Sequence, residues 1–389
     1  MEFDENPDHA AIRDAVAQIA APYGGAYYTG HAERHQPTTE LWQALGRQGF
    51  IGINMPEEFG GGGAGLTELA LVCEETAAQG APLLLLLVSS AISGEVLTRY
   101  GSEQQKKTWL PGMATGQRKV VFAITEPDAG SNTHQLSTTA RRDGDEWVLR
   151  GTKYYISGVD EADALIVVAR TGTAGGGTGQ AAGKGLMSLF LVPADSPGLV
   201  ASELPVSASL PEKQFTLFFD DVRLEAGQLI GGQDEGFRQV FHGLNPERIT
   251  GAAICVGVGR YALARAARYA TQREVWGAPI GTHQGIAHAL AKAKIEVDLA
   301  ALMTAKAAWL HDHDLPAGEA ANEAKYAAAE AAIAAVDAAI QTHGGNGMST
   351  EYGLVPLWGL ARLLRIAPVS AEMVLNYVAQ HSLGLPRSY

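Results

Sequence analysis

The sequence has little of what marks a secreted or membrane-spanning protein. Its 389 residues include only two cysteines, Cys73 and Cys255, which lie in apolar, helix-like segments without a Cys-x-x-Cys spacing. Neither disulfides nor a zinc site is therefore expected. The first residues are acidic and lack the basic region of a signal or transit peptide. The longest purely apolar run, Leu83 to Val88, is far too short to cross a bilayer. These absences favour a cytoplasmic protein without membrane insertion.

Positive charge is also scarce. Lys and Arg number 29 against 42 Asp and Glu, which gives a formal net charge of -13. This excess of negative charge argues against binding to nucleic acid or to an anionic membrane surface. Hydrophobic residues make up 46% of the chain, which is enough for a globular enzyme, and the length suggests two or three domains.

Three successive patterns predict an α+β fold. In residues 1–118 apolar side chains recur at steps of three and four, with a flexible break at Gly60–Gly65, so we expect an N-terminal helical domain. Residues 119–228 carry short β-rich runs and predict a small middle β-barrel. Within them, residues 171–185 are nearly all Gly, Ala and Thr, and we expect a mobile hairpin loop. Residues 229–389 predict a C-terminal antiparallel four-helix bundle. The expected strands are 120–124, 146–149, 164–168, 186–192 and 215–219, and the expected bundle helices are 247–273, 283–310, 319–343 and 368–383.

Two turns in the middle domain combine β-type runs with Gly, Pro and hydroxyl residues. They are Phe122–Asn132 and Gly151–Gly158. Such turns at strand ends can direct backbone N–H groups and the hydroxyls of Thr125, Ser131 and Ser157 toward one ligand. On composition alone, two ordinary hairpin loops are the simpler interpretation.

Other motifs that suggest a ligand have the wrong context. Gly177–Gly179 with Ala182 lies in the low-complexity loop, and Gly257–Gly259 with Ala262 lies inside a helical pattern. Neither has the strand–turn–helix context of a dinucleotide-binding fingerprint. His311–Asp314 is a polar helix end next to a proline, and we expect no metal there.

Several motifs, in order along the chain, are similar to those of the FAD-dependent acyl-CoA dehydrogenase family. They are Phe122–Asn132, Gly151–Gly158, Phe219–Arg223, Ile230–Phe237, Tyr269–Ile280 with Gln284, and Gln341–Tyr352. The resemblance covers nearly the whole chain and implies bound FAD and conversion of an acyl-CoA to its trans-2-enoyl-CoA. It also implies fatty-acid β-oxidation, an electron-transfer flavoprotein as electron acceptor, and a homotetramer or homodimer.

The resemblance also implies roles for single residues. Thr125 and Ser157 would contact the isoalloxazine ring, Tyr155 would shield one flavin face, and Ser131 would lie near the thioester. The complete set of implied FAD contacts is Phe122, Thr125, Ser131, Tyr155, Ser157, Arg273, Gln284, Gln341, Gly344, Gly345, Ser370 and Glu372. Of these, Arg273, Gln284 and the Gly344–Gly345 backbone would reach the FAD of a neighbouring subunit. Without the family, Arg273 is interpreted as a solvated helix-end cation and the glycine pair as a helix stop.

The chain departs from the family at the catalytic base. In the family a carboxylate takes the α-proton while flavin N5 takes the β-hydride. The family segment that carries this carboxylate aligns with Ala367–Ser370, so Pro368 stands at its position. Proline also lacks the backbone N–H that, in the family, donates to the thioester oxygen. The Val369 N–H is a candidate replacement.

A second carboxylate can replace the missing base. In members that resemble isovaleryl- and long-chain acyl-CoA dehydrogenases the base lies on a bundle helix, at a position that matches Glu247, with Arg248 helping to hold CoA. Locally, Asn245 as N-cap and Pro246 as the first residue predict that a helix begins here. The alternative role for Glu247 is then an acid in the first turn, where the helix dipole stabilises the ionised form. Because position 368 has no carboxylate, we predict that Glu247 is the base.

The substrate is expected to be aliphatic. Leu83–Ser90 aligns with the wall of the acyl-chain pocket, and Leu87 and Ser90 are the predicted substrate contacts. The segment has no Arg or Lys to receive a second carboxylate, which favours a medium-length or branched acyl chain, although core packing explains the apolar run equally well. Two other functions stay open: a flavin monooxygenase or oxidase on the same fold, and a non-catalytic or partner-dependent subunit.

Overall fold

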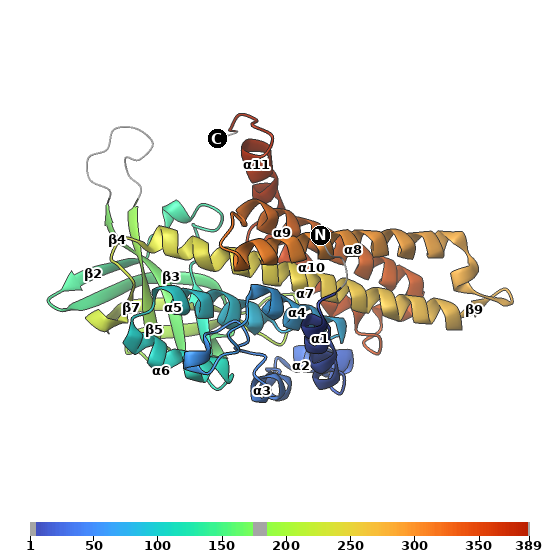
Figure 1. Ribbon diagram of the computed structural model, residues 1–389, viewed down its shortest axis with the longest axis horizontal. Coiled ribbons are helices and arrows are strands. Elements are labelled where there is room, and N and C mark those ends of the chain that lie inside the picture. Colours follow the sequence, from blue (N-terminus) through green and yellow to red (C-terminus); the bar gives the residue numbers. More distant parts are fainter. Residues whose placement is uncertain (1–4, 174–184, 388–389) are drawn as a thin grey trace.

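The N-terminal part of the computed structural model is helical, as predicted. The model describes residues 5–173 and 185–387. Its first helices are α1 (Pro7–Ala20), α2 (Gly24–Arg34), α3 (Thr39–Arg47), α4 (Leu66–Ala78), α5 (Gly94–Tyr100) and α6 (Glu103–Ala114), with a π-helix, η2 (Leu86–Ser93), before α5. Helix α4 is almost completely buried because it packs between α1 and the long bundle helix described below (Figure 1). The Gly60–Gly65 break lies just before α4.

The middle part forms one mixed sheet. In the described part of the chain its strands are β1 (Val120–Ala123), β2 (Thr139–Asp143), β3 (Glu146–Ser157), β4 (Ala164–Thr173), β5 (Gly185–Pro193), β6 (Leu199–Leu204), β7 (Gln214–Glu225) and β8 (Leu229–Ile230). The order is β6-β7-β3-β2-β4-β5-β8, and β1 pairs in parallel with β4. All five predicted strands are present. Strands β2 and β6 were missed because they are mostly exposed and lack an apolar run. Of the predicted hairpin loop, residues 174–184, with the Gly177–Ala182 motif, lie outside the described residues.

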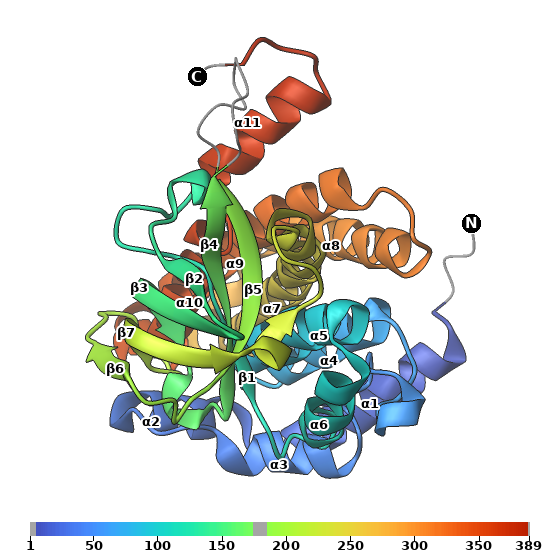
Figure 2. The same cartoon turned by 90° about the vertical axis from the view of Figure 1, so that its left-hand side faces the viewer.

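The C-terminal part is a bundle of long helices. It contains α7 (Gly236–Gln272), α8 (Gln284–Asp312), α9 (Gly318–His343), α10 (Leu354–Ile366) and α11 (Ala371–His381), and a small hairpin, β9 (Glu274–Val275) with β10 (Ala278–Pro279), joins α7 to α8. Most alanines of α9 are buried, which lets neighbouring helices approach closely. The helix predicted at 368–383 is α11, which contacts α9 and then projects away from the bundle (Figures 1 and 2). Helix α10, which the sequence analysis missed, packs on α9 and α7 instead.

The predicted start of the first bundle helix is wrong. Helix α7 begins at Gly236, and Pro246 lies inside it. An interior proline costs a helix about 3 kcal/mol, but α7 packs against α4, α9 and η2 over much of its length. Asn245 does not cap the helix, since its Oδ1 accepts from Arg248 Nη1 at 2.9 Å. Glu247 is therefore in the helix interior, and the first-turn dipole argument does not apply to it.

One stretch, 354–381, is long and apolar enough by composition to cross a membrane. In the structure residues 367–370 divide it into α10, of 13 residues, and α11, of 11 residues. A membrane-spanning helix needs about 20 consecutive residues. Neither half reaches that length.

Candidate active site

Hydrogen bonds from β3 hold the turn that contains Thr125. Lys153 Nζ donates to the carbonyl of Ile124 at 2.9 Å, and the Tyr154 N–H donates to the carbonyl of Thr125 at 2.8 Å. Lys153 Nζ also lies 2.8 Å from Glu126 Oε1. Both backbone carbonyls of the turn are thus held on the sheet side. The Thr125 hydroxyl has no hydrogen-bond partner within residues 5–173 and 185–387 and is available to a ligand.

Glu126 is the residue that joins this turn to the next loop. Its carboxylate accepts from the Ser137 N–H at 2.6 Å, from the Ser137 hydroxyl at 2.7 Å and from the Thr138 N–H at 3.0 Å. Burial alone would raise the pKa of Glu126, but Lys153 and these donors lower it to about 2. Sequence analysis missed Glu126 and Lys153. The available signal was a lysine inside an apolar β-type run.

Strand β3 ends in a bulge that presents Tyr155. The register with β7 shifts between Lys153 and Ile156, and Tyr155 has a φ of 57°, which is rare for a residue other than glycine. Bulges of this kind re-aim side chains beside binding sites. The Tyr155 ring is 55% exposed, while Ser157 Oγ donates to Gln214 Oε1 at 3.0 Å. The Tyr155 ring packs edge-on against Tyr154, with ring centroids 4.4 Å apart, and its exposed side is available to cover a bound ring.

The other predicted site residues of the middle domain have different surroundings. Ser131 is exposed in the turn that follows Thr125. Phe122 is buried in β1, where it pairs with Ile166 of β4, and its predicted contact with FAD stays a prediction. Thr125, Tyr155 and Ser157 are the predicted residues that the sheet brings to one edge.

The predicted acyl-chain wall lies between this edge and α7. A Cβ atom placed on Gly158 would lie 2.6 Å from Leu85 Cδ2, and one placed on Gly251 would lie 3.2 Å from Leu87 Cδ1. Leu83–Ser90 is buried throughout and enters a π-helix, a distortion that is frequent at functional sites. The Ser90 hydroxyl is buried and has no hydrogen-bond partner in the described part of the chain. The segment therefore connects the Ser157 turn to α7 one turn beyond Glu247.

Glu247, the predicted base, lies inside α7 and is largely buried. Burial raises the pKa of its carboxyl group to about 8, although the charges of Arg248 and Lys325 oppose the rise. The side chain keeps a small solvent-reachable surface. Among the described residues its carboxylate makes neither a hydrogen bond nor an ion pair. A carboxyl group that is poorly solvated, unpaired and still reachable suits proton abstraction.

Arg248 is held beside Glu247. Its Nη1 is bonded to Asn245, and its Nε is buried without a hydrogen-bond partner in the described chain. Burial lowers the pKa of the guanidinium, while Glu247 opposes this change. Since an arginine stays charged in proteins, Arg248 provides a fixed cation next to the carboxylate.

A second group of predicted FAD contacts lies at the end of the bundle that is farther from the sheet. Arg273 follows α7 and Gln284 begins α8. The stacking of Tyr269 on His343, with ring centroids 4.2 Å apart, brings the end of α9 to the same place. A groove of about 490 Å³ between α8 and α9 is lined there by Gln341, among other residues.

This far end is separated from the sheet by the length of the bundle. In Figure 1 the β9 hairpin and the sheet lie at opposite ends of the molecule. Gly344 has φ 59° and ψ -134°, which favours glycine, and both Gly344 and Gly345 have open space where a side chain would be. Their amides can approach a diphosphate, and Arg273 is exposed beside them. The two groups of predicted FAD contacts therefore lie toward opposite ends of this chain.

Ser370 and Glu372 form the start of α11. Ser370 Oγ accepts from the Met373 N–H at 3.3 Å and caps the helix. The Glu372 N–H and the Ser370 hydroxyl lower the pKa of the Glu372 carboxyl group. Their predicted contact with FAD stays a prediction.

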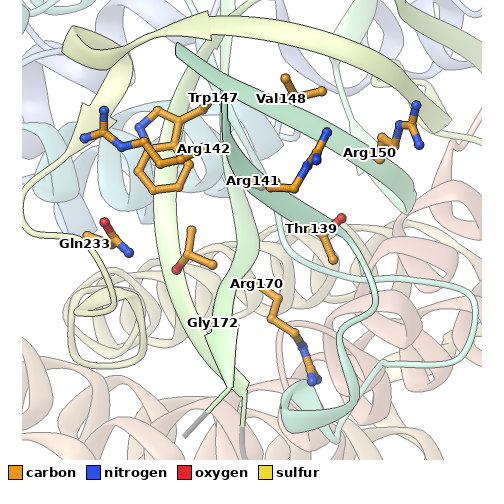
Figure 3. A pocket seen from close by; sticks show the side chains of 11 residues that line it. Thr139, Arg141, Arg142, Trp147, Val148, Arg150, Arg170, Gly172 and Gln233 are labelled. Atoms are coloured by element: carbon orange, nitrogen blue, oxygen red, sulfur yellow. The ribbon is translucent and has the colours of Figure 1, made fainter. Parts of the chain in front are cut away.

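A groove of about 640 Å³ on the sheet is a different feature (Figure 3). Arg142 lies over the Trp147 ring at 4.8 Å, Arg150 pairs with Asp221, and Arg170 donates to the His134 carbonyl at 3.1 Å. Its arginines are therefore largely engaged with the protein itself. The chemistry points to Glu247 and the Thr125 turn, and not to this groove.

The fold and the site define a three-domain flavoprotein, and comparison with known proteins gives the family. Models of the N-terminal, middle and C-terminal domains of acyl-CoA dehydrogenases match residues 6–117, 121–222 and 234–383. The chain belongs to the acyl-CoA dehydrogenase family, whose members are oxidoreductases that act on the CH–CH group of acyl-CoA.

Individual relatives agree with this assignment. Acyl-CoA dehydrogenase FadE12 of Mycobacterium tuberculosis is 54% identical over 100% of this chain and 99% of its own. A glutaryl-coenzyme A dehydrogenase in complex with glutaryl-CoA has a TM-score of 0.92 at 30% identity and covers 100% of this chain and 98% of its own. Glutaryl-CoA dehydrogenase of Mycobacterium smegmatis in complex with FADH2 has a TM-score of 0.91 at 27% identity, over 99% and 96% of the two chains.

FAD is the cofactor of this family, and the residues present here fit it. The Thr125 hydroxyl, which has no partner in the described part of the chain, and the exposed Tyr155 side chain would hold one part of the cofactor. Arg273 and the open Gly344–Gly345 backbone would hold another part. The predicted family, fold class and cofactor are thereby confirmed.

Proposed function

We propose that this protein dehydrogenates a medium-length or branched aliphatic acyl-CoA, with Glu247 as the base that takes the α-proton. FAD, when bound, supplies the acceptor for the β-hydride. The observation that carries the proposal is the place of Glu247 inside α7, one turn before Gly251, which contacts the buried wall Leu83–Ser90. The Glu247 carboxylate has no hydrogen-bond or ion-pair partner among the described residues, and its burial raises its pKa to about 8. Thioester α-protons are weakly acidic, so a base with a raised pKa is needed to remove them.

The other residues orient and enclose the substrate. The buried wall Leu83–Ser90 excludes water from the space beside Glu247 and favours an aliphatic chain. Because this wall carries no cation, it does not favour a second carboxylate on the acyl group. Arg248 is placed to attract the negative charge of CoA. Ser131 is exposed in the turn after Thr125, where the channel for the thioester is proposed.

The enzyme is proposed to act as a homotetramer or homodimer. The two halves of the flavin site lie at opposite ends of one chain (Figure 1). In addition, Ile295, Leu299, Leu302 and Trp309 are exposed on α8 at the spacing of one helix face. A second subunit that covers this face would bring Arg273 and Gln284 to a neighbouring FAD. An electron-transfer flavoprotein as acceptor, a role in β-oxidation and a cytoplasmic location complete the proposal.

The test is the Glu247→Gln variant. We expect anaerobic flavin reduction by a good acyl-CoA to slow by at least about 10²-fold, because an amide cannot take the proton. Glu103→Gln on α6, where the carboxylate is exposed, is the matched control and should reduce flavin at the normal rate. Full activity of Glu247→Gln with normal FAD content would contradict the proposal.

Two alternatives have separate outcomes. Rapid oxygen consumption without an added electron acceptor would indicate a monooxygenase or oxidase. Purified protein without the yellow colour of bound flavin would indicate a non-catalytic or partner-dependent subunit.

A further inference from the structure

Lys325 on α9 is a buried lysine that the proposed mechanism does not yet use. It is only 2% exposed, and its Nζ donates to the Arg365 carbonyl at 2.8 Å and to the Val369 carbonyl. Arg365 is in the last turn of α10, and Val369 is in the turn before α11. One side chain therefore ties α9 to both sides of the turn 367–370.

The charge of the same ammonium group acts on the Glu247 carboxyl group. Helices α7 and α9 pack against each other, and Lys325 opposes the rise in the pKa of Glu247. Burial lowers the pKa of Lys325 itself to about 8, and the charges of Arg248 and Glu247 on α7 act on it as well. The lysine is thus bonded to the turn, and its charge acts on the proposed base.

The turn has an unused hydrogen-bond donor. The Val369 N–H has no acceptor within the described residues, and Pro368 before it has no N–H to offer. Val369 itself is half-buried. When an α-proton leaves a thioester, negative charge builds up on the thioester oxygen, and a fixed donor there stabilises the transition state.

We infer that Lys325 is a positioning residue that holds the turn 367–370 so that the Val369 N–H donates to the thioester oxygen of the acyl-CoA. The inference rests on the proposed function, because it places the thioester beside Glu247. Lys325 itself does not touch the substrate. It acts by fixing the Arg365 carbonyl at the end of α10 and the Val369 carbonyl in the turn, and its charge also makes ionisation of Glu247 easier.

The Val369 donor is tested by a pair of variants, Val369→Pro and Val369→Ala. Proline removes the N–H, whereas alanine keeps it and shortens the side chain. We expect kcat of Val369→Pro to fall by about 10²–10³-fold with little change in KM, which is the size of the effect for loss of one such donor. Val369→Ala should stay near the wild-type value.

The role of Lys325 is tested by Lys325→Met and Lys325→Gln. Lys325→Met should lower kcat and move the rise of kcat/KM to higher pH, because Glu247 then keeps only Arg248 as a nearby cation. A purely structural role would lower the unfolding temperature without moving the pH profile. Lys325→Gln keeps a donor for one carbonyl and should give an intermediate loss of kcat. If Lys325→Met does not fold, Lys325→Gln provides the same test.

An equilibrium measurement separates this inference from the choice of base. A 3-oxoacyl-CoA loses its acidic α-proton to buffer, and its enolate is detected by charge-transfer absorbance beside oxidised flavin. Lys325→Met and Val369→Pro should each bind less of the enolate form at equal FAD content. Wild-type enolate binding by both variants would overturn the inference. A fully active Glu247→Gln enzyme would refute only the assignment of Glu247 as the base. The comparison of enolate binding between the variants would stay valid.

Discussion

The ammonium of Lys153 lies 2.8 Å from Glu126 Oε1, and both side chains are almost completely buried. A buried ion pair is stabilising only when its remaining hydrogen-bonding capacity is used. Here Lys153 also donates to Ile124, and Glu126 accepts from Ser137 and Thr138. The pair therefore shapes the turn around Thr125, which is one of the predicted FAD contacts.

Lys153→Met should be one of the most damaging single substitutions. It leaves the Glu126 carboxylate buried without its cation, and breaking such a pair costs about 3–5 kcal/mol. We expect a lower free energy of unfolding in urea and loss of bound FAD. Arg223→Gln, which removes an exposed pair with Glu146, should change neither quantity appreciably. Normal FAD content in Lys153→Met would contradict this role.

Acid should weaken the same turn. The pKa of Glu126 falls from 4.5 to about 2 in the folded protein. The folded state therefore binds this proton less readily than the unfolded chain does. Its stabilisation is fully present above pH 4.5 and is lost as the pH falls toward 2. Unfolding curves measured across this range should show a steeper loss of stability for the wild type than for Glu126→Gln. Equal slopes would show that Glu126 does not contribute.

Much of the fold was readable from sequence because each pattern was local. The strands in β3, β4 and β5 are apolar runs bounded by turn residues, and the long helices repeat small apolar residues. The Glu247 assignment came instead from a resemblance, since nothing near position 247 distinguishes a base from a surface acid.

The errors came from tertiary packing that local signals do not contain. Asn245 and Pro246 are typical residues for the start of a helix. Helix α7 nevertheless continues through them, because its contacts with neighbouring elements stabilise it. Lys153 and Lys325 are ordinary lysines in the sequence. Their roles depend on carbonyls and carboxylates that the fold brings from distant segments.

The rate of α-proton abstraction should rise with pH. Only the carboxylate form of Glu247 accepts a proton, and its pKa is raised to about 8 by burial against the opposing charges of Arg248 and Lys325. Anaerobic flavin reduction at low substrate concentration should therefore increase between pH 6 and 9, with a midpoint near 8. The Glu103→Gln control should give the same curve. A rate that is already constant from pH 6 would mean that another group is the base.

Acyl-chain preference should respond to Leu87. Its Cδ1 lies against Gly251 of α7, so a larger side chain at position 87 would fill space beside the proposed chain pocket. We expect Leu87→Trp to shift the best substrate toward shorter acyl-CoAs in a kcat/KM series, with kcat for the shortest chains little affected. Leu45→Met, in the core of the N-terminal domain, is a control for general repacking. An unchanged chain-length profile would place the pocket elsewhere.

The separation of Thr125 from Arg273 along the molecule makes a prediction about subunits. Thr125→Val and Arg273→Ala should each lower FAD retention when expressed alone, because each weakens every flavin site. When the two variants are expressed together, a mixed pair of subunits contains one site with both substitutions and one site with neither. Flavin content and activity should then recover in part, and the recovered fraction should co-purify with both differently tagged chains. If both halves of the site belonged to one chain, mixing would restore nothing.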